Sequence, residues 1–379
     1  MGAVAASVII PTYNRVEGLA QVLGAFEKQR PADLPFEVVV VDDGSDDATS
    51  ATLANWRSRR FRLRFQSQPN GGPALARNRA FKMASGDIVL FGGDDIEPHP
   101  DQVAEHLAEH DRRGDPRAAV LGLTAWPEGA DLTSTMRHID GPGAQQFSYS
   151  VFTDGAEYDF RHFYTSNVSV RRELLAAEPG GFSCEFPAAA FEDAEFAYRL
   201  ARRGMKIFYH ASALAWHHHH YNARSFFARQ VRCGEMADVL FRIHPQLAKW
   251  IDLRTLMWHR LEILTSDRSY RAKVAQVRDG LETWERRATG LAVFFDEPAT
   301  DLADPLLYAL FRYGFVKGLA VARFGRDAGL TLAADQWLRL VPTAVDAVRE
   351  RAEERRIPLP QGDVSAIIDV AADENDRDP

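Results

Sequence analysis

The stretch Phe36-Glu37-Val38-Val39-Val40-Val41-Asp42-Asp43-Gly44-Ser45 sets four consecutive valines directly before two carboxylates and a glycine turn. A continuous apolar run of this length is typical of a strand that is buried on both faces, as in a parallel sheet. The same order recurs at Val8-Ile9-Ile10-Pro11-Thr12 and at Leu90-Phe91-Gly92-Gly93-Asp94-Asp95. Each of these apolar runs therefore predicts a buried strand with polar side chains at its end.

Segments with helical spacing separate the apolar runs. Helices are expected at residues 16–28, 46–59 and 73–84, with Asp46 or Asp47 as a cap of the second, and further strands at residues 62–65 and 87–91. Strands that alternate with helices at this spacing predict a Rossmann-like α/β half. Because ligands of such sheets bind beyond the carboxyl ends of the strands, we expect Thr12, Asp43 and Asp95 to converge on one crevice.

The remainder of the chain predicts a second half of the sheet and then a helical region. A helix is expected at residues 191–203, a loop-rich segment at 124–150, and strands at 119–123, 163–170, 206–209 and 214–216. From Ala223 onward the pattern is mostly helical. We therefore expect a catalytic domain at residues 1–225, a helical region at 226–362 and an acidic, disordered tail at 363–379.

Two apolar stripes mark the helical region. They are Trp250, Met257, Trp258, Leu261 and Leu264, and Leu306, Leu307, Leu310, Phe311 and Phe315. Such stripes usually form the core between packed helices. We expect core here rather than membrane contact, in an accessory region that shapes a binding site or forms a homodimer.

The motifs together resemble one enzyme family. The ordered set Pro11-Thr12-Tyr13-Asn14, Asp42-Asp43-Gly44-Ser45, Gly93-Asp94-Asp95 and Glu192-Asp193 resembles the inverting family 2 glycosyltransferases, over roughly residues 6–234. The resemblance implies a GT-A fold, which is an α/β Rossmann-like mixed sheet flanked by helices. It also implies a hexosyltransferase-like enzyme that moves a sugar from a nucleotide diphosphate to a hydroxyl group with inversion.

Within that resemblance, the first motifs imply a nucleotide site. Asp43 matches the residue that accepts the imide N–H of uracil, so UDP is the expected nucleotide, and Pro11, Thr12 and Tyr13 are expected beside it. By itself, Asp43 equally fits an Asx-turn or a helix cap.

The third motif implies a divalent cation. Asp95 is the expected ligand of Mn²⁺ or Mg²⁺, which take oxygen ligands, and Asp94 is expected to contact the donor ribose or sugar. Gly93 stands where the family often has a first acid. His217, with His219 as second choice, matches a family histidine that completes the metal shell; imidazole suits Mn²⁺ better than Mg²⁺. A polar surface run is the alternative for both histidines.

Two further residues are matched to the donor. Arg77 lies in the first turns of a helix that follows Asn70-Gly71-Gly72-Pro73, and the resemblance places it at the diphosphate, which arginine can bind bidentately. Asn167, in Thr165-Ser166-Asn167, is expected to bind a sugar hydroxyl. An ordinary turn and an ordinary loop are the alternatives.

The pair Glu192-Asp193 matches the catalytic acids of the family. An inverting transferase needs a base that takes the proton of the acceptor hydroxyl, and Asp193 is expected in that role. Glu192 is expected to orient Asp193 or to bind the acceptor. The alternative is a pair of acids that interacts with the helix dipole.

The composition of the chain limits the kinds of molecule that it is expected to bind. The 379 residues carry a net charge of −8, which gives no basic footprint and argues against nucleic acid. Residues 1–10 lack the basic start of a signal peptide, and we find no apolar stretch of about 20 residues, so a cytoplasmic enzyme is expected, with peripheral membrane contact if its acceptor is lipid-linked. The acceptor is a glycan, a lipid-linked glycan or another hydroxyl compound. A nucleotidyltransferase and a non-catalytic sugar-nucleotide-binding scaffold are the alternatives.

Overall fold

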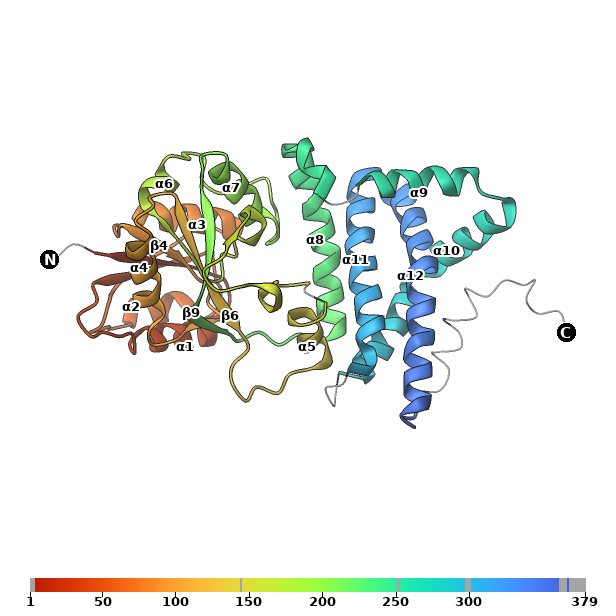
Figure 1. Ribbon diagram of the computed structural model, residues 1–379, viewed down its shortest axis with the longest axis horizontal. Helices are drawn as coiled ribbons and strands as arrows, with labels where there is room; N and C mark the ends of the chain where they lie inside the picture. Colours follow the sequence, from red (N-terminus) through yellow and green to blue (C-terminus); the bar gives the residue numbers. More distant parts are fainter. Residues whose placement is uncertain (1–3, 144, 251–252, 297–300, 361–366, 368–379) are drawn as a thin grey trace. The chain divides into compact units, whose positions relative to one another are not determined.

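The computed structural model describes residues 4–143, 145–250, 253–296, 301–360 and 367 (Figure 1). The chain forms two compact units, Met1–Ala130 with Phe147–His219, and Asp131–Gln146 with His220–Pro379. Residues 131–146, which the sequence analysis assigned to the first domain, thus cluster with the C-terminal helices. Apart from Ile367, the expected tail at 363–379 lies outside the described residues.

The first unit is built on a mixed sheet of nine strands. Their bounds are β1 (Ala6–Thr12), β2 (Phe36–Asp42), β3 (Arg62–Ser67), β4 (Ile88–Phe91), β5 (Ile96–Pro98), β6 (Ala118–Ala125), β7 (Glu157–Tyr158), β8 (Val168–Arg171) and β9 (Lys206–His217). The strand order is β3-β2-β1-β4-β8-β6-β9-β5, with β7 paired to β9. β1 to β4 are mutually parallel, whereas β8 runs antiparallel to both β4 and β6. The expected mixed α/β sheet is confirmed.

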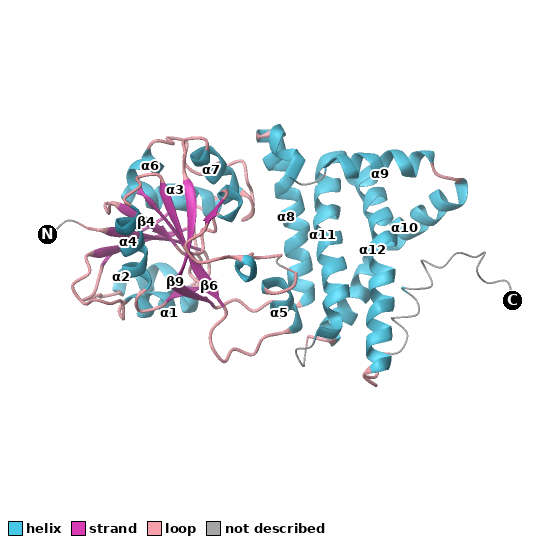
Figure 2. Ribbon diagram, viewed as in Figure 1, coloured by secondary structure: helices cyan, strands magenta, loops and turns pink. Residues whose placement is uncertain are grey.

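Helices flank this sheet (Figure 2). They are α1 (Val16–Phe26), α2 (Thr49–Asn55), α3 (Gly72–Met83), α4 (Gln102–Arg113), α6 (Arg172–Ala176) and α7 (Glu192–Ala201). Alternate residues of β1 and β2, such as Val8 and Val38, join Leu19 of α1 and Leu53 of α2 in one buried cluster. Ile9 points to the other face, as strand alternation requires, and is equally buried. Burial of both faces explains why these strands have continuous apolar sequences.

Three sequence expectations differ from the structure. The helix expected at residues 46–59 is only Thr49–Asn55, because Trp56 turns extended and Asp47 accepts the N–H of Thr49 and of Val16 instead of capping a longer helix. The two strands expected at 206–209 and 214–216 are one strand, β9, whose pairing with β6 shifts register at a bulge. The strand expected at 163–170 begins only at Val168.

The second unit is helical in its described residues. Its helices are α5 (Ser134–Asp140), α8 (Ala223–Ile243), α9 (Leu253–Thr265), α10 (Arg268–Phe294), α11 (Asp304–Phe324) and α12 (Arg326–Glu354). Among the described residues, no helix combines the length and the apolar character needed to span a bilayer.

The predicted burial is observed for only one of the two apolar stripes. In α11, Leu306, Leu307, Leu310 and Phe311 are fully buried, as predicted, and Phe315 is half-buried. The prediction of core for the α9 stripe is wrong, because Met257, Trp258, Leu261 and Leu264 are 51–68% exposed. The side chain of Trp250 lies outside the described residues.

Glycines allow α8 and α11 to pack with their backbones in close approach. A Cβ atom added at Gly318 would overlap the carbonyl oxygen of Val231, and one added at Gly234 would overlap that of Phe315. These atoms belong to helix backbones, which cannot move aside as a flexible side chain does. The interface therefore depends on the absence of a side chain at both positions.

We expect Gly318→Ala to lower the unfolding free energy of the protein by about 1–3 kcal/mol, because the added methyl overpacks the α8–α11 interface. The matched control is Gly290→Ala in α10, where an added Cβ meets nothing within 4 Å. That control should be neutral or stabilising by up to about 1 kcal/mol, the helix-propensity gain. Denaturant unfolding followed by circular dichroism measures both; equal midpoints for the two variants would contradict the prediction.

Candidate functional site

The carboxyl ends of β1, β2 and β4 bring the predicted polar residues together. Thr12 ends β1, and its carbonyl oxygen accepts the N–H of Asp43 at 2.9 Å. Its hydroxyl donates to Asp94 Oδ2 at 2.8 Å. Thr12 thus joins the segment that follows β2 to the segment that follows β4, and Asp95 is the next residue. The expected convergence of Thr12, Asp43 and Asp95 is observed.

Asp43 holds the loop that leads into α3. Its Oδ1 accepts hydrogen bonds from Gln68 Nε2 at 2.6 Å and from the N–H of Gly71 at 3.0 Å, and its Oδ2 accepts the N–H of Gly72 at 2.7 Å. Asp43 is 4% exposed. The carboxylate therefore fixes the backbone at the start of α3, and Oδ2 keeps a lone pair for one more donor.

The remaining residues of the first motif border this loop. Pro11 pairs with Val41 inside the sheet and is half-buried, whereas the Tyr13 side chain is 49% exposed. Asn14 has a positive φ of 52°, donates its N–H to Ser45 Oγ, and accepts the N–H of Asp46. These bonds fix the β1–α1 loop against the β2–α2 loop.

A possible metal-binding group lies on the same edge of the sheet. One ligand atom each from Asp95, His217 and His219 lies within 4.8 Å of the others. His217 ends β9 and His219 follows it; their nearest ring nitrogens are 3.7 Å and 3.6 Å from Asp95 Oδ2. One carboxylate with two imidazoles is a donor set that fits Mn²⁺ better than Mg²⁺. The structure thus groups both predicted histidines with Asp95.

Arg15 is a further residue of this cluster, and the sequence analysis missed it. Its Nη1 donates to Asp95 Oδ2 at 2.7 Å and is 3.7 Å from Asp94 Oδ1, and its Nη2 is 3.3 Å from His219 Nδ1. Its place directly after Pro-Thr-Tyr-Asn, ahead of α1, is the signal that could have identified it. A guanidinium therefore shares the oxygen and nitrogen atoms that would hold a cation.

The adjacent carboxylates Asp94 and Asp95 have pKa values that are shifted in opposite directions. Burial, reinforced by the charge of Asp95, raises the pKa of Asp94 to about 6, against the lowering effect of Thr12 and Arg15. Burial would also raise the pKa of Asp95, but the interactions with His217 and His219 and the charge of Arg15 hold that pKa well below its usual range. Asp95 is therefore the ionised partner for a cation.

Aromatic rings connect this cluster to the second acidic motif. Trp126 stacks on His217, with ring centroids 5.2 Å apart and planes 9° from parallel. Phe147 lies 6.2 Å from His217 and 5.0 Å from Tyr164. Burial, and to a smaller extent the charge of Asp193, raises the pKa of Tyr164. Asp193 therefore lies close enough to affect the far end of this aromatic series.

The pair Glu192-Asp193 begins α7 after a residue in an uncommon conformation. Phe191 has φ 65°, a region that non-glycine residues seldom occupy and that is found at functional sites. Burial and the charge of Glu192 raise the pKa of Asp193 to about 7, although Arg77 opposes the shift. Such a carboxylate is poised to exchange a proton near neutral pH.

Arg77 is paired with Glu192 rather than free. Its Nη1 donates to Glu192 Oε1 at 2.9 Å, and both side chains are buried. Within the described residues, Arg77 Nε and Glu192 Oε2 are buried without a hydrogen-bond partner. Arg77 and Glu192 therefore form a buried ion pair at the start of α7, directly beside Asp193.

The structure contradicts the expected contact of Asn167 with a sugar. Asn167 is 0% exposed, and its amide is saturated within the fold. Its oxygen accepts from Gln102 and is 2.8 Å from His106 Nε2, and its nitrogen donates to the carbonyl oxygens of Leu123 and Ala213. Asn167 therefore ties β8 to α4, β6 and β9, a role that a single-sequence motif could not reveal.

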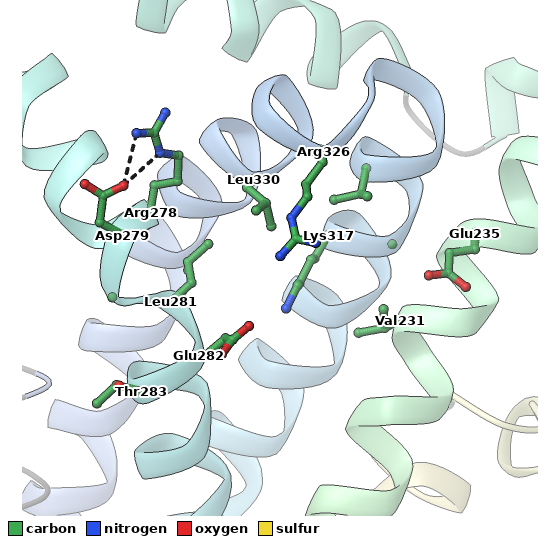
Figure 3. Close-up of a pocket in the computed structure, with 13 residues that line it drawn as sticks. Val231, Glu235, Arg278, Asp279, Leu281, Glu282, Thr283, Lys317, Arg326 and Leu330 are labelled. Atoms are coloured by element: carbon green, nitrogen blue, oxygen red, sulfur yellow. Dashed lines mark hydrogen bonds and ion pairs between the residues drawn. The ribbon is translucent and has the colours of Figure 1, made fainter.

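A pocket of about 600 Å³ lies in the second unit, among α8, α10, α11 and α12 (Figure 3). Its charged lining includes Lys317, Arg326 and Glu282, and Arg278 is paired with Asp279. Lys317 also binds Glu285 at 2.6 Å. All the predicted site residues belong to the first unit, so this pocket contains none of them.

The chain is similar in sequence to known glycosyltransferases. The family model described as glycosyl transferase family 2 matches residues 7–177. Validoxylamine A glucosyltransferase of Streptomyces hygroscopicus subsp. jinggangensis is 30% identical over 321 residues, which are 78% of this chain and 72% of that protein. The uncharacterized glycosyltransferase YfnE of Bacillus subtilis is 27% identical, over 67% of this chain and 72% of that protein.

A solved structure, residues 1–349 of TarS of S. aureus, is 18% identical with a TM-score of 0.49, over 97% of this chain and 89% of that chain. The sequence similarity and the mixed sheet, which has carboxylates at its strand ends, both indicate the same family. The chain belongs to glycosyltransferase family 2, with the GT-A fold.

Proposed function

We propose that this glycosyltransferase moves a hexosyl group from a UDP-sugar to a hydroxyl acceptor with inversion, and that Asp193 is its base. The observation that carries the proposal is the placement of Glu192 and Asp193 in the first turn of α7, where Arg77 binds Glu192 at 2.9 Å and burial raises the pKa of Asp193. A base with a pKa near the working pH combines a usable deprotonated fraction with a strong drive for proton transfer.

The donor nucleotide is proposed to bind along the β1 and β2 ends. Asp43 Oδ2 accepts one hydrogen bond and retains capacity for the imide N–H of uracil. Pro11, Thr12 and Tyr13 border the base and ribose, and Asp94 accepts a hydroxyl of the ribose or sugar. Arg77 is proposed to support the diphosphate by the positive charge of its guanidinium, which is buried beside Glu192.

A divalent cation is proposed at Asp95 with His217 and His219, and the one carboxylate and two imidazoles favour Mn²⁺. Bound there, such a cation would neutralise charge on the leaving diphosphate. Arg15 competes for the same ligand atoms, so it is proposed to neutralise Asp95 when no metal is present.

In the reaction, the acceptor oxygen forms a bond to C1 of the sugar as the bond from C1 to the diphosphate oxygen breaks. Asp193 takes the proton of the acceptor hydroxyl, and the diphosphate leaves with the electron pair. Glu192, held in place by Arg77, is proposed to orient Asp193 or to bind the acceptor. Attack from the face opposite the diphosphate gives inversion.

The acceptor is proposed to be a hydroxyl-bearing glycan, lipid-linked glycan or smaller compound. The name of the relative validoxylamine A glucosyltransferase supports transfer of a hexosyl group. The helical unit is proposed to shape the acceptor site or to form a homodimer.

Asp193→Asn tests the base directly. We expect kcat to fall by about 10²–10⁴-fold, the usual contribution of a general base, with UDP affinity measured by calorimetry in the presence of Mn²⁺ essentially unchanged. Asp101→Asn, a partly exposed carboxylate paired with Arg30, is the matched control and should keep wild-type activity. Full turnover of a labelled UDP-sugar by Asp193→Asn would remove Asp193 from the mechanism.

The pH dependence follows from the same group. Because Asp193 must be deprotonated to act and burial raises its pKa to about 7, kcat/KM should fall about tenfold per pH unit below that value. An aspartate at its ordinary pKa near 4 would give a flat profile down to about pH 5. Steady-state rates between pH 5 and 9 distinguish the two, and a flat profile would refute the raised pKa.

Arg15→Gln tests the competition for the metal site. Like unit charges about 4 Å apart repel by about 4 kcal/mol at the effective dielectric constant of a protein surface, so removal of Arg15 should tighten Mn²⁺ binding at least about tenfold. Electron paramagnetic resonance titration of Mn²⁺ without nucleotide measures this. Arg30→Gln is the control, and Asp95→Asn should weaken binding; unchanged or weaker binding in Arg15→Gln would contradict the model.

A further inference from the structure

Helix α9 presents an apolar face to the outside of its unit. Met257, Trp258, Leu261 and Leu264 are 58%, 68%, 51% and 62% exposed. At about 100° per residue, these four positions lie within one sector of the helix, so they form a continuous face. Together with Arg260 they line a shallow pocket of about 580 Å³. We name these four residues the α9 apolar face.

This exposure is not caused by a loosely attached helix. The opposite side of α9 carries Leu256 and Ile263, which are buried. Its polar residues bind α12, since His259 Nδ1 is 3.3 Å from Asp335 Oδ2 and Glu262 Oε2 accepts from Arg339 at 3.1 Å. The contacts on one side of α9 therefore fix its orientation, and the apolar face on the other side points outward.

The charged residues around the α9 apolar face are mostly basic, although the chain as a whole has a net negative charge. Residues 257–273 contain four Lys or Arg side chains and two acids, in a chain of net charge −8. Both acids serve the fold, because Glu262 binds Arg339 and Asp267 caps α10 through the N–H of Tyr270. Arg271 donates to the carbonyl oxygen of Leu264, so one exposed cation lies directly beside the face.

We propose that the α9 apolar face binds an anionic lipid surface. A helix with an outward tryptophan and aliphatic residues, bordered by arginines, has the pattern of interfacial helices that insert their apolar side below the headgroups. Arg260, Arg268 and Arg271, all exposed, complement anionic headgroups at about 1 kcal/mol per cation near such a surface.

A second copy of the chain fits this face less well. From their exposed fractions and side-chain areas of roughly 200 Å², the four residues expose about 500 Å². A standard interface buries about 800 Å² per partner, and its centre is depleted of charge. A lipid surface needs no such area and makes use of the arginines.

Vesicle flotation of the full chain tests the proposal. Wild-type protein should bind vesicles of phosphatidylcholine with 25 mol % phosphatidylglycerol, and much less to phosphatidylcholine alone or in 0.5 M salt. Trp258→Ser with Leu261→Ser should lower the bound-to-free ratio at least tenfold, and Arg260→Gln with Arg271→Gln should lower it on anionic vesicles. Circular dichroism confirms that the variants are folded.

Val151→Ser and Tyr308→Ser remove exposed apolar side chains outside the α9 face and should bind like wild type. Absence of binding to anionic vesicles, or equal loss in these controls, would overturn the proposal. A different result would also overturn the proposal: light scattering shows that the wild type is a dimer and that the Trp258→Ser, Leu261→Ser variant is a monomer, while neither protein binds vesicles.

Discussion

The parallel pairing of β1 with both β2 and β4 is the constraint on which the site depends. Ala6 lies opposite Phe36 on one side and Ile88 on the other, so the three strands are aligned and end at the same edge. The buried strands supply the rigidity, because their side chains are packed on both faces. Thr12, Asp43 and Asp94 meet because the strands end at the same edge, where Thr12 accepts the N–H of Asp43 and donates its hydroxyl to Asp94.

Charge balance is the second constraint on this edge. Asp94 and Asp95 are adjacent carboxylates, and the guanidinium of Arg15 lies 3.7 Å and 2.7 Å from them, which offsets their repulsion. At the α7 end, Arg77 neutralises Glu192 and leaves Asp193 with a raised pKa. Asp94 and Asp193 thus each have a raised pKa beside a second carboxylate, an arrangement suited to binding at one pair and proton transfer at the other.

Sequence patterns predicted the sheet well where burial was two-sided. The runs at Val8–Ile10 and Val38–Val41 could hardly be anything but central strands, and the acids that follow them were correctly expected at one edge. The short strand β5 and the continuity of β9 across a bulge were not foreseen, because neither has a distinctive local pattern. Asn167 was misjudged for a related reason: a polar residue in a loop-like motif gives no sign that four partners from other elements will saturate it.

The sequence by itself determined the alternation of strands and helices, the order of the acidic motifs and the family, because these depend on local periodicity and on short spacings. Only the tertiary structure decided which side chains lie together. Arg15 binds Asp95, Arg77 binds Glu192, and His217 and His219 are grouped at Asp95. It also decided that the α9 stripe faces outward while the α11 stripe is buried, although both have the same helical spacing. Amphipathic spacing shows that a helix has an apolar face, but only the packing of distant helices decides whether that face is covered.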